Sequence, residues 1–457
     1  MKIFLGYNDY FRKKENKDVP VYWNSEDLIN PHLILCGKSG TGKSYQLLRF
    51  ISEAIKTASP GFERYHNLDV HGDLVVPGES RVEFSRATRY GYNPLVLDPN
   101  PKSGGVDRQI NFLIQTIGQE SRKLMDRQQA CMRNLLTDVY AVYGIHEEHP
   151  ETWVREEMTE AMRTALWAER RWADMQRYYP TLDDAIGLGE RKLKAMYGGL
   201  NVNEQGTRAV AALEEMNRAA STMNNAATSK SKKFDVDDKE QAQKVLDAAK
   251  AKFLDKVTNY VSSIETGREF EDLIKYDSKE VLKGVIDRLK NLKATGIFNA
   301  NPPPFDPDAK VWSYDLTNLD EQDKFIFAKV RAQHIARQRK LGGLQGEIRE
   351  IIGLDEAPVV FDDNPDSIYN KIAKELRKFG LALWCAAQTP SDFPEGVITT
   401  VSTKILLGID SYYWSASCKK LNIEDKVLKF ITPQQTIAAY MDKKGSLNAK
   451  FVNVQLK

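Results

Sequence analysis

Residues 37–44 constrain this chain more than any other segment. They read Gly-Lys-Ser-Gly-Thr-Gly-Lys-Ser and match the pattern G-x-x-x-x-G-K-[ST]. An apolar run at 32–36 precedes them and a segment with helical spacing at 45–56 follows, which is the strand–loop–helix context that such a loop requires. Its glycines let backbone N–H groups curl around phosphate oxygens. The sequence therefore predicts a phosphate-binding loop made of Gly37, Lys38, Ser39, Gly40, Thr41, Gly42, Lys43 and Ser44.

A phosphate-binding loop of this kind needs a metal ion and a group that orients the attacking water. We expect Lys43 to place its charge on the β- and γ-phosphates of ATP and the Ser44 hydroxyl to ligate Mg²⁺. The apolar run 350–354 ends in Asp355-Glu356. We interpret Asp355 as an outer-sphere ligand of Mg²⁺ and Glu356 as the general base.

Two further polar positions flank the apolar run 381–387. Gln388 follows it and either senses the γ-phosphate, since an amide can both donate and accept, or caps the loop. Arg377 precedes it, at the end of a predicted helix over 367–379. A guanidinium there suits a γ-phosphate of a neighbouring subunit, but it also suits the dipole of its own helix, and the residue alone leaves both readings open.

The fragment Asp69-Val-His71-Gly-Asp73 has the residue types of a metal site. One histidine with no further clustered histidine is weak evidence for a dedicated site, so we expect this fragment to close a loop beside residues 37–44.

The fold class predicted for the chain is α/β, with a nucleotide-binding sheet interrupted by helices. Short apolar runs of strand length lie at 32–36, 64–70, 311–315, 350–354, 381–387 and 404–409. Residues 107–292 instead carry dense charge and apolar residues at helical spacing. The prolines at 302–304 then break the helical run. We therefore expect residues 1–106 and 293–457 to form one domain and residues 107–292 an all-helical insertion.

Within that insertion, residues 217–238 are polar, which is typical of a mobile loop. Lys230, Lys232 and Lys233 could contact a nucleic-acid backbone there, although a solvated loop is the simpler explanation for them.

Composition excludes several classes. The 65 basic and 63 acidic residues nearly cancel, so any nucleic-acid contact must come from a local patch. The four cysteines form no C-x-x-C pair, which argues against a zinc site and fits a reducing cytoplasm. No stretch approaches the roughly 20 apolar residues of a membrane span. We expect a cytoplasmic protein with no membrane span of its own, which reaches the inner face of a membrane only through partners.

Taken together, these motifs resemble the FtsK/HerA superfamily of P-loop ATPases, particularly its conjugative type IV secretion ATPase and coupling-protein branch. The similar segments are 32–44, 69–74, 92–95, 353–357 and 377–388. The resemblance implies a RecA-like nucleotide-binding domain with a large all-α insertion, ATP bound between the subunits of a homo-hexamer, Arg377 acting in trans and a channel for DNA. Coupling proteins of this type usually begin with transmembrane helices, which this chain lacks.

Three functions compete at this point. The leading hypothesis is an ATP-driven motor that moves DNA, or a DNA–protein conjugate, in conjugation or a related mobile-element system, with a relaxase or secretion-channel proteins as partners. The first alternative is a HerA-like translocase in repair, phage packaging or defence. The second is an ATP-dependent scaffold that docks substrates without moving them.

Overall fold

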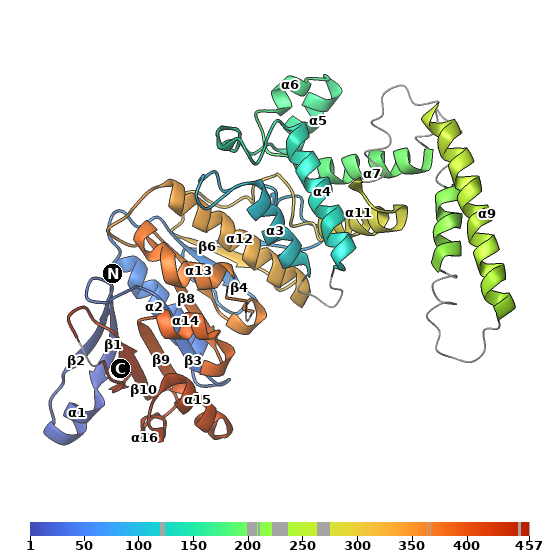
Figure 1. Cartoon of the computed structure of the whole chain (residues 1–457). Helices are drawn as coiled ribbons and strands as arrows, with labels where there is room; N and C mark the ends of the chain where they lie inside the picture. Colours follow the sequence, from blue (N-terminus) through green and yellow to red (C-terminus); the bar gives the residue numbers. More distant parts are fainter. Residues whose placement is uncertain are drawn as a thin grey trace. The chain divides into compact units, whose positions relative to one another are not determined.

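The computed structural model of the chain describes residues 1–118, 124–198, 208, 211–221, 236–262, 275–362, 364–365, 367–446 and 449–456 (Figure 1). The chain divides into two compact units. Residues 1–94, 158–162 and 293–457 form the first, and residues 95–157 and 163–292 form the second. Independent folding of an insertion over 107–292 stays a prediction.

The first unit is built on an eleven-stranded sheet in the order β2-β1-β11-β10-β9-β3-β8-β7-β4-β6-β5. The strands from β9 to β5 pair in parallel, and those from β2 to β9 pair antiparallel. Their bounds are β1 Lys2–Asn8, β2 Pro20–Asn24, β3 Leu33–Gly37, β4 Arg64–Asp69, β5 Ser80–Glu83, β6 Val311–Asp315, β7 Glu350–Leu354, β8 Leu381–Ala387, β9 Thr403–Gly408, β10 Thr436–Met441 and β11 Val452–Gln455. The predicted α/β class is confirmed.

Helices cover the parallel part of the sheet, which explains its continuous apolar strands. Helix α2 (Lys43–Lys56) packs Leu47, Phe50 and Ile51 into a core with alternate residues of the sheet, such as Leu33 and Leu35 of β3. Helices α12 (Glu321–Leu341), α13 (Ile368–Glu375) and α14 (Glu395–Thr400) cover the opposite face (Figure 1). Short helices α1 (Asp9–Glu15), α15 (Trp414–Leu421) and α16 (Asp425–Lys429) complete this unit.

The regular structure of the second unit is helical where it is described. The helices that lie wholly or mostly in it are α3 Val106–Gly118, α4 Asp126–Val142, α5 Glu160–Ala168, α6 Trp172–Met175, α7 Leu182–Gly198, α9 Val236–Val261 and α11 Lys279–Ala294. Helices α4, α7 and α11 meet closely, since a Cβ at Gly189 of α7 would lie 2.9 Å from Ile286 and 3.2 Å from Leu135.

The loop predicted over 217–238 is wrong at both ends, because residues 217–221 are helical and 236–238 begin α9. Residues 222–235, with Lys230, Lys232 and Lys233, lie outside the described residues.

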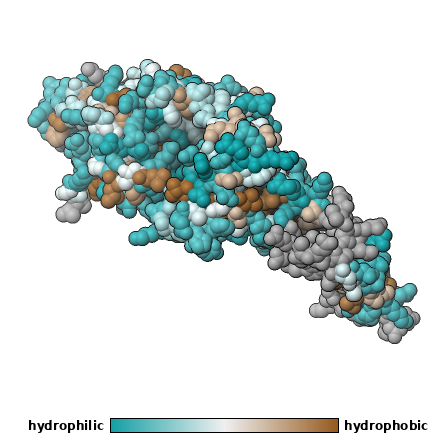
Figure 2. Space-filling view, turned by 90° about the horizontal axis from the view of Figure 1, so that it is seen from above, coloured by the Kyte–Doolittle hydropathy of each residue, from teal (hydrophilic) through white to brown (hydrophobic). Residues whose placement is uncertain are grey.

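Among the described helices, none combines the length and the apolar character that crossing a bilayer requires. The face drawn in Figure 2 is mostly hydrophilic, with its apolar residues in small patches.

Candidate nucleotide-binding site

The glycine-rich loop lies between the end of β3 and the start of α2. Gly40 and Gly42 have φ angles of +81° and +87°, a backbone conformation that residues with a Cβ rarely adopt. Gly42 is also the N-cap of α2. The Lys38 N–H donates to the Gly408 carbonyl at 2.9 Å and the Thr41 hydroxyl donates to the Lys38 carbonyl at 2.7 Å. The loop is therefore held open in front of the helix N-terminus, where anions bind favourably.

A cavity of about 470 Å³ lies in front of this loop. Because β3, β7 and β8 are parallel, the residues that follow them meet at one edge of the sheet, where ligands of α/β proteins usually bind. The cavity is lined by Lys38, Ser39, Gly40, Gly42, Lys43, Ser44, Tyr45, His71, Asp73, Asp355, Glu356, Gln388 and Gln434. The structure thus brings together the predicted loop, both predicted carboxylates and Gln388.

Lys43 and Glu356 form an ion pair inside the cavity. The Lys43 Nζ lies 3.0 Å from Glu356 Oε2, and both side chains are largely buried. His71 Nε2 lies 3.9 Å from the same carboxylate oxygen. A phosphate group that reaches Lys43 must replace this carboxylate.

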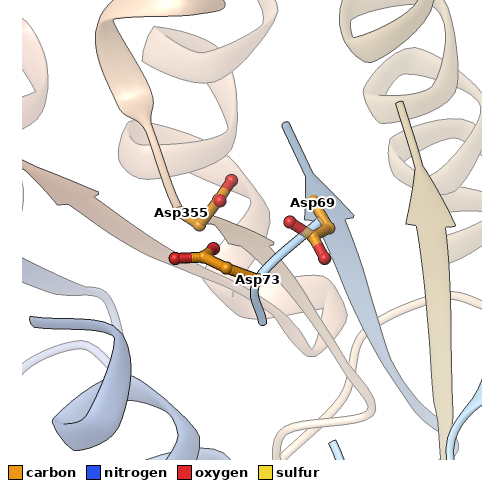
Figure 3. A group of neighbouring side chains, drawn as sticks. All are labelled: Asp69, Asp73 and Asp355. Atoms are coloured by element: carbon orange, nitrogen blue, oxygen red, sulfur yellow. The ribbon is translucent and has the colours of Figure 1, made fainter. Parts of the chain in front are cut away.

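Three carboxylates converge beside Ser44. Asp69, Asp73 and Asp355 each offer an oxygen within 4.8 Å of the others (Figure 3). The Ser44 hydroxyl donates to Asp73 Oδ2 at 3.4 Å, and the Val70 N–H donates to Asp355 Oδ1 at 3.1 Å. Burial raises the pKa of Asp355 to about 7, and the charges of Asp69 and Asp73 act in the same direction. Hard oxygen donors of this kind suit Mg²⁺, whose charge would relieve their repulsion.

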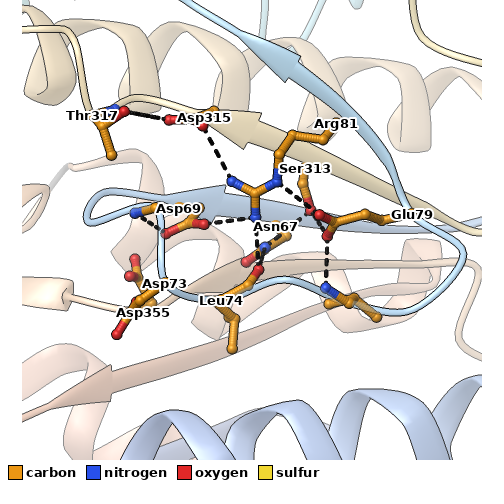
Figure 4. A network of polar contacts seen from close by, with 12 residues as sticks. Asn67, Asp69, Asp73, Leu74, Glu79, Arg81, Ser313, Asp315, Thr317 and Asp355 are labelled. Carbon is orange, nitrogen blue, oxygen red and sulfur yellow. Dashed lines mark hydrogen bonds and ion pairs between the residues drawn. The ribbon is translucent and has the colours of Figure 1, made fainter.

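Arg81 of β5 contacts one carboxylate of this cluster, Asp69 (Figure 4). Its guanidinium pairs with Asp69 at 2.8 Å, Glu79 at 2.7 Å and Asp315 at 3.3 Å. The other oxygen of Asp69 accepts a hydrogen bond from the Gly72 N–H at 2.7 Å. Both oxygens of Asp69 are therefore engaged, which leaves Ser44, Asp73 and Asp355 as the groups best able to hold a metal ion.

Sequence reasoning underrated Asp73 and missed Gln434. Asp73 was visible in the fragment 69–73, but its approach to Ser44 and Asp355 depends on the pairing of β4 with β7. Gln434 Nε2 donates to the Gly40 carbonyl at 2.9 Å from a backbone with φ +62°. No motif around residue 434 signals this contact, because the contact arises from the way the chain enters β10.

Arg377 lies away from the cavity. It is an exposed residue of the 3-10 helix η3 (Leu376–Phe379), and its guanidinium donates to the Ile29 carbonyl. Arg377 precedes β8 whereas Gln388 follows it. The two residues therefore lie at opposite ends of this strand, about 20 Å apart along it. The structure does not bring Arg377 to the phosphate-binding loop of the same chain.

A glycine-rich loop between a buried parallel strand and a helix, with paired carboxylates after a neighbouring strand, defines a RecA-like P-loop nucleoside triphosphatase. Within that class the chain belongs to the HerA helicase family, because the model of the central domain of helicase HerA matches residues 12–313. The FtsK/HerA resemblance is thereby confirmed.

Solved structures are similar to this chain, and the first of the two below shows the same fold. The VirB4 structure of Thermoanaerobacter pseudethanolicus aligns with a TM-score of 0.61 at 13% identity, covering 100% of this chain and 96% of that chain. A bacterial conjugative coupling protein, TrwBdeltaN70, aligns at 10% identity with a TM-score of 0.47, covering 93% and 84%. No curated protein sequence matches this chain.

Proposed function

We propose that this chain is an ATP-hydrolysing, homo-hexameric motor that moves DNA, or a DNA–protein conjugate, in conjugative transfer or a related mobile-element system. The observation that carries the ATPase part is the convergence of Lys43, Ser44, Asp355 and Glu356 on one cavity. The HerA helicase family supports the nucleic-acid part. The conjugative context rests on the sequence resemblance described above.

The residues of the cavity divide the chemistry among them. The N–H groups of the loop hold the phosphates, and Lys43 leaves Glu356 to contact the β- and γ-phosphates of ATP. The Ser44 hydroxyl and the carboxylates of Asp73 and Asp355 would hold Mg²⁺. Mg²⁺ supplies charge that stabilises the phosphoryl group in transfer.

Glu356, released from Lys43, accepts a proton from water. The water oxygen bonds to the γ-phosphorus while the bond from that phosphorus to the β–γ bridging oxygen breaks, which yields ADP and phosphate. Gln388 lies at the cavity, where its amide can contact the γ-phosphate.

The hexamer is proposed because Arg377 lies away from the cavity of its own chain. An exposed guanidinium at the opposite edge of the sheet can reach the γ-phosphate of an adjacent subunit when chains pack head to tail, and such packing forms a ring when the rotation between subunits closes. We propose that the ring acts in the cytoplasm or at the inner face of the membrane, where a relaxase or secretion-channel proteins would recruit it.

The test is ATP hydrolysis by the purified chain, measured with and without Mg²⁺ and DNA, together with displacement of a strand from a DNA triplex. We expect hydrolysis to require Mg²⁺, to rise with DNA and to displace the strand. Hydrolysis without displacement would favour the scaffold. Displacement by a chain encoded beside a nuclease gene would favour the HerA-like translocase of repair, packaging or defence.

A further inference from the structure

The second unit contains a cavity of its own, of about 350 Å³, formed by α4, α6, α7 and the end of α5. Its volume is in the range of small-molecule and cofactor sites. It is lined by Val139, Val142, Tyr143, Trp167, Trp172, Ala173, Met175, Gln176, Asp184, Leu188 and Arg191. The proposed ATP chemistry uses none of these residues.

Two tryptophans at this cavity remain open to solvent. The rings of Trp167 and Trp172 lie 4.7 Å apart at 85°, an edge-to-face pair, yet the residues are 38% and 49% exposed. Tryptophan normally buries more of its large apolar surface, and adjacent exposed rings are typical of binding surfaces. The pair therefore offers an aromatic face to a ligand.

The turn that joins the two rings has an unusual residue. Arg170 follows the end of α5 with a φ of +55°, and the next N–H, of Arg171, donates to the Leu166 carbonyl at 2.9 Å. Glycine is the usual residue at such a left-handed helix end, because a Cβ is disfavoured there. The Arg170 guanidinium is exposed and has no hydrogen bond or ion pair within the part of the chain that the structure describes. A costly backbone at this position is consistent with a side chain kept for binding.

The charges around the rings favour an anion. The one carboxylate in the lining, Asp184, forms an ion pair with Arg163 at 2.8 Å. The guanidinium of Arg163 also lies 5.7 Å from the centre of the Trp167 ring. Arg191 lies 6.0 Å from the same ring centre and makes no ion pair with any described residue. The cavity therefore combines stacking faces with unpaired positive charge.

We propose that this cavity binds a nucleobase of single-stranded nucleic acid, stacked on Trp167 or Trp172, with Arg170 and Arg191 on the neighbouring phosphates. Every base has a π-face, so aromatic platforms beside cationic side chains bind single strands with little sequence preference. The inference extends the proposed function by locating a contact for its nucleic acid. It does not depend on ATP hydrolysis, because the first unit contributes no residue to this cavity.

The experiment measures binding of a fluorescein-labelled oligothymidylate to the full chain by anisotropy, without ATP. Trp172→Ala should weaken binding about fivefold or more. Arg191→Ala should weaken it too, and should lower the slope of log K against log salt by about 0.7 if one phosphate contact is lost. Arg108→Ala is the matched control, since Arg108 is an exposed arginine of the same unit outside the cavity. Lys43→Ala should keep full binding, which separates this site from the ATP site.

Arg170→Gly guards against misfolding, because glycine suits the backbone at that position and only the side chain is lost. It should weaken binding like Arg191→Ala. An oligonucleotide carrying 5-iododeoxyuridine should also crosslink to Trp167 or Trp172 on irradiation. If folded Trp172→Ala, Arg191→Ala and Arg170→Gly all bind as tightly as Arg108→Ala, the proposal is wrong, and an apolar segment of a partner protein becomes the occupant to examine.

Discussion

Lys43 and Glu356 are paired across the phosphate-binding site, with Nζ and Oε2 3.0 Å apart. The ammonium group of Lys43 and the carboxylate of Glu356 are therefore bound to each other rather than to a phosphate or a water molecule. ATP that engages the lysine frees the carboxylate at the same moment, so the proposed base becomes available only when a phosphate is present.

Glu356→Gln tests this relationship. Hydrolysis should fall by about 10² to 10⁴, the range for loss of a general base. ATP binding should persist or tighten slightly, because a neutral amide competes less for Lys43. Single-turnover hydrolysis and binding of a fluorescent ATP analogue measure the two effects. Lys43→Ala should lose both, and a Glu356→Gln protein with the parent rate would mean that the base lies elsewhere.

Arg81→Ala should affect stability and metal use together. It leaves Asp69, which is fully buried, without its cation, and loss of a buried partner costs about 3 kcal/mol. The Mg²⁺ concentration for half-maximal hydrolysis should also rise, because the loop that carries Asp73 loosens. Urea unfolding and a Mg²⁺ titration measure these changes.

The matched control for Arg81 is Arg86→Ala, which removes an exposed pair with Asp320 worth about 1 kcal/mol or less. Equal effects of the two substitutions on the Mg²⁺ titration would contradict a positioning role for Arg81.

Arg377→Ala should bind ATP nearly normally and hydrolyse it poorly, since a trans-acting arginine contributes about 10³ or more in rate. Mixing it with Lys43→Ala is decisive, because some interfaces of a mixed ring join an intact Lys43 to an intact Arg377. Activity should return at those interfaces. If the two mutant chains exchange into common rings and stay inactive, Arg377 works within its own chain or only supports the fold.

His32 should make the fold acid-sensitive. Its Nδ1 accepts the Leu383 N–H at 3.0 Å, and burial lowers its pKa to about 4 from an ordinary 6.5. Between pH 6.5 and pH 4 His32 is protonated in the unfolded chain but stays neutral in the folded chain. The free energy of unfolding is therefore highest above pH 6.5 and falls as the pH is lowered toward 4. The loss reaches about 3 kcal/mol. His32→Asn should flatten this part of the profile in urea unfolding at pH 7 and pH 5, and an unchanged slope would contradict the assignment.

Local sequence patterns predicted the phosphate-binding loop and the buried strands, because these features depend only on residues close together in the sequence. The phosphate-binding loop has fixed spacing between a buried strand and a helix, and the apolar strands β3, β7 and β8 are continuous because both faces are covered. The carboxylates Asp355 and Glu356 followed from the end of such a strand. These elements needed no knowledge of which strands are neighbours.

Features that depend on distant pairing escaped prediction. Strands β1, β2 and β11 are partly exposed, and β1 meets β11 through Tyr7 and Gln455. Gln434 reaches Gly40 because β10 joins the sheet beside β9, and Asp73 reaches Asp355 because β4 lies beside β7. Sequence periodicity contains no information on such neighbours.

The strand order also dictates when the phosphate-binding loop can form during synthesis. Strand β3 has β8 and β9 as its neighbours, and both come more than three hundred residues later in the chain. At about 5–20 residues per second, residues 37–44 wait roughly 20 to 70 s for the strands that hold them. The helices of the second unit, whose contacts are more local, emerge during that interval. The ATP site is therefore among the last parts of the nascent chain to assemble.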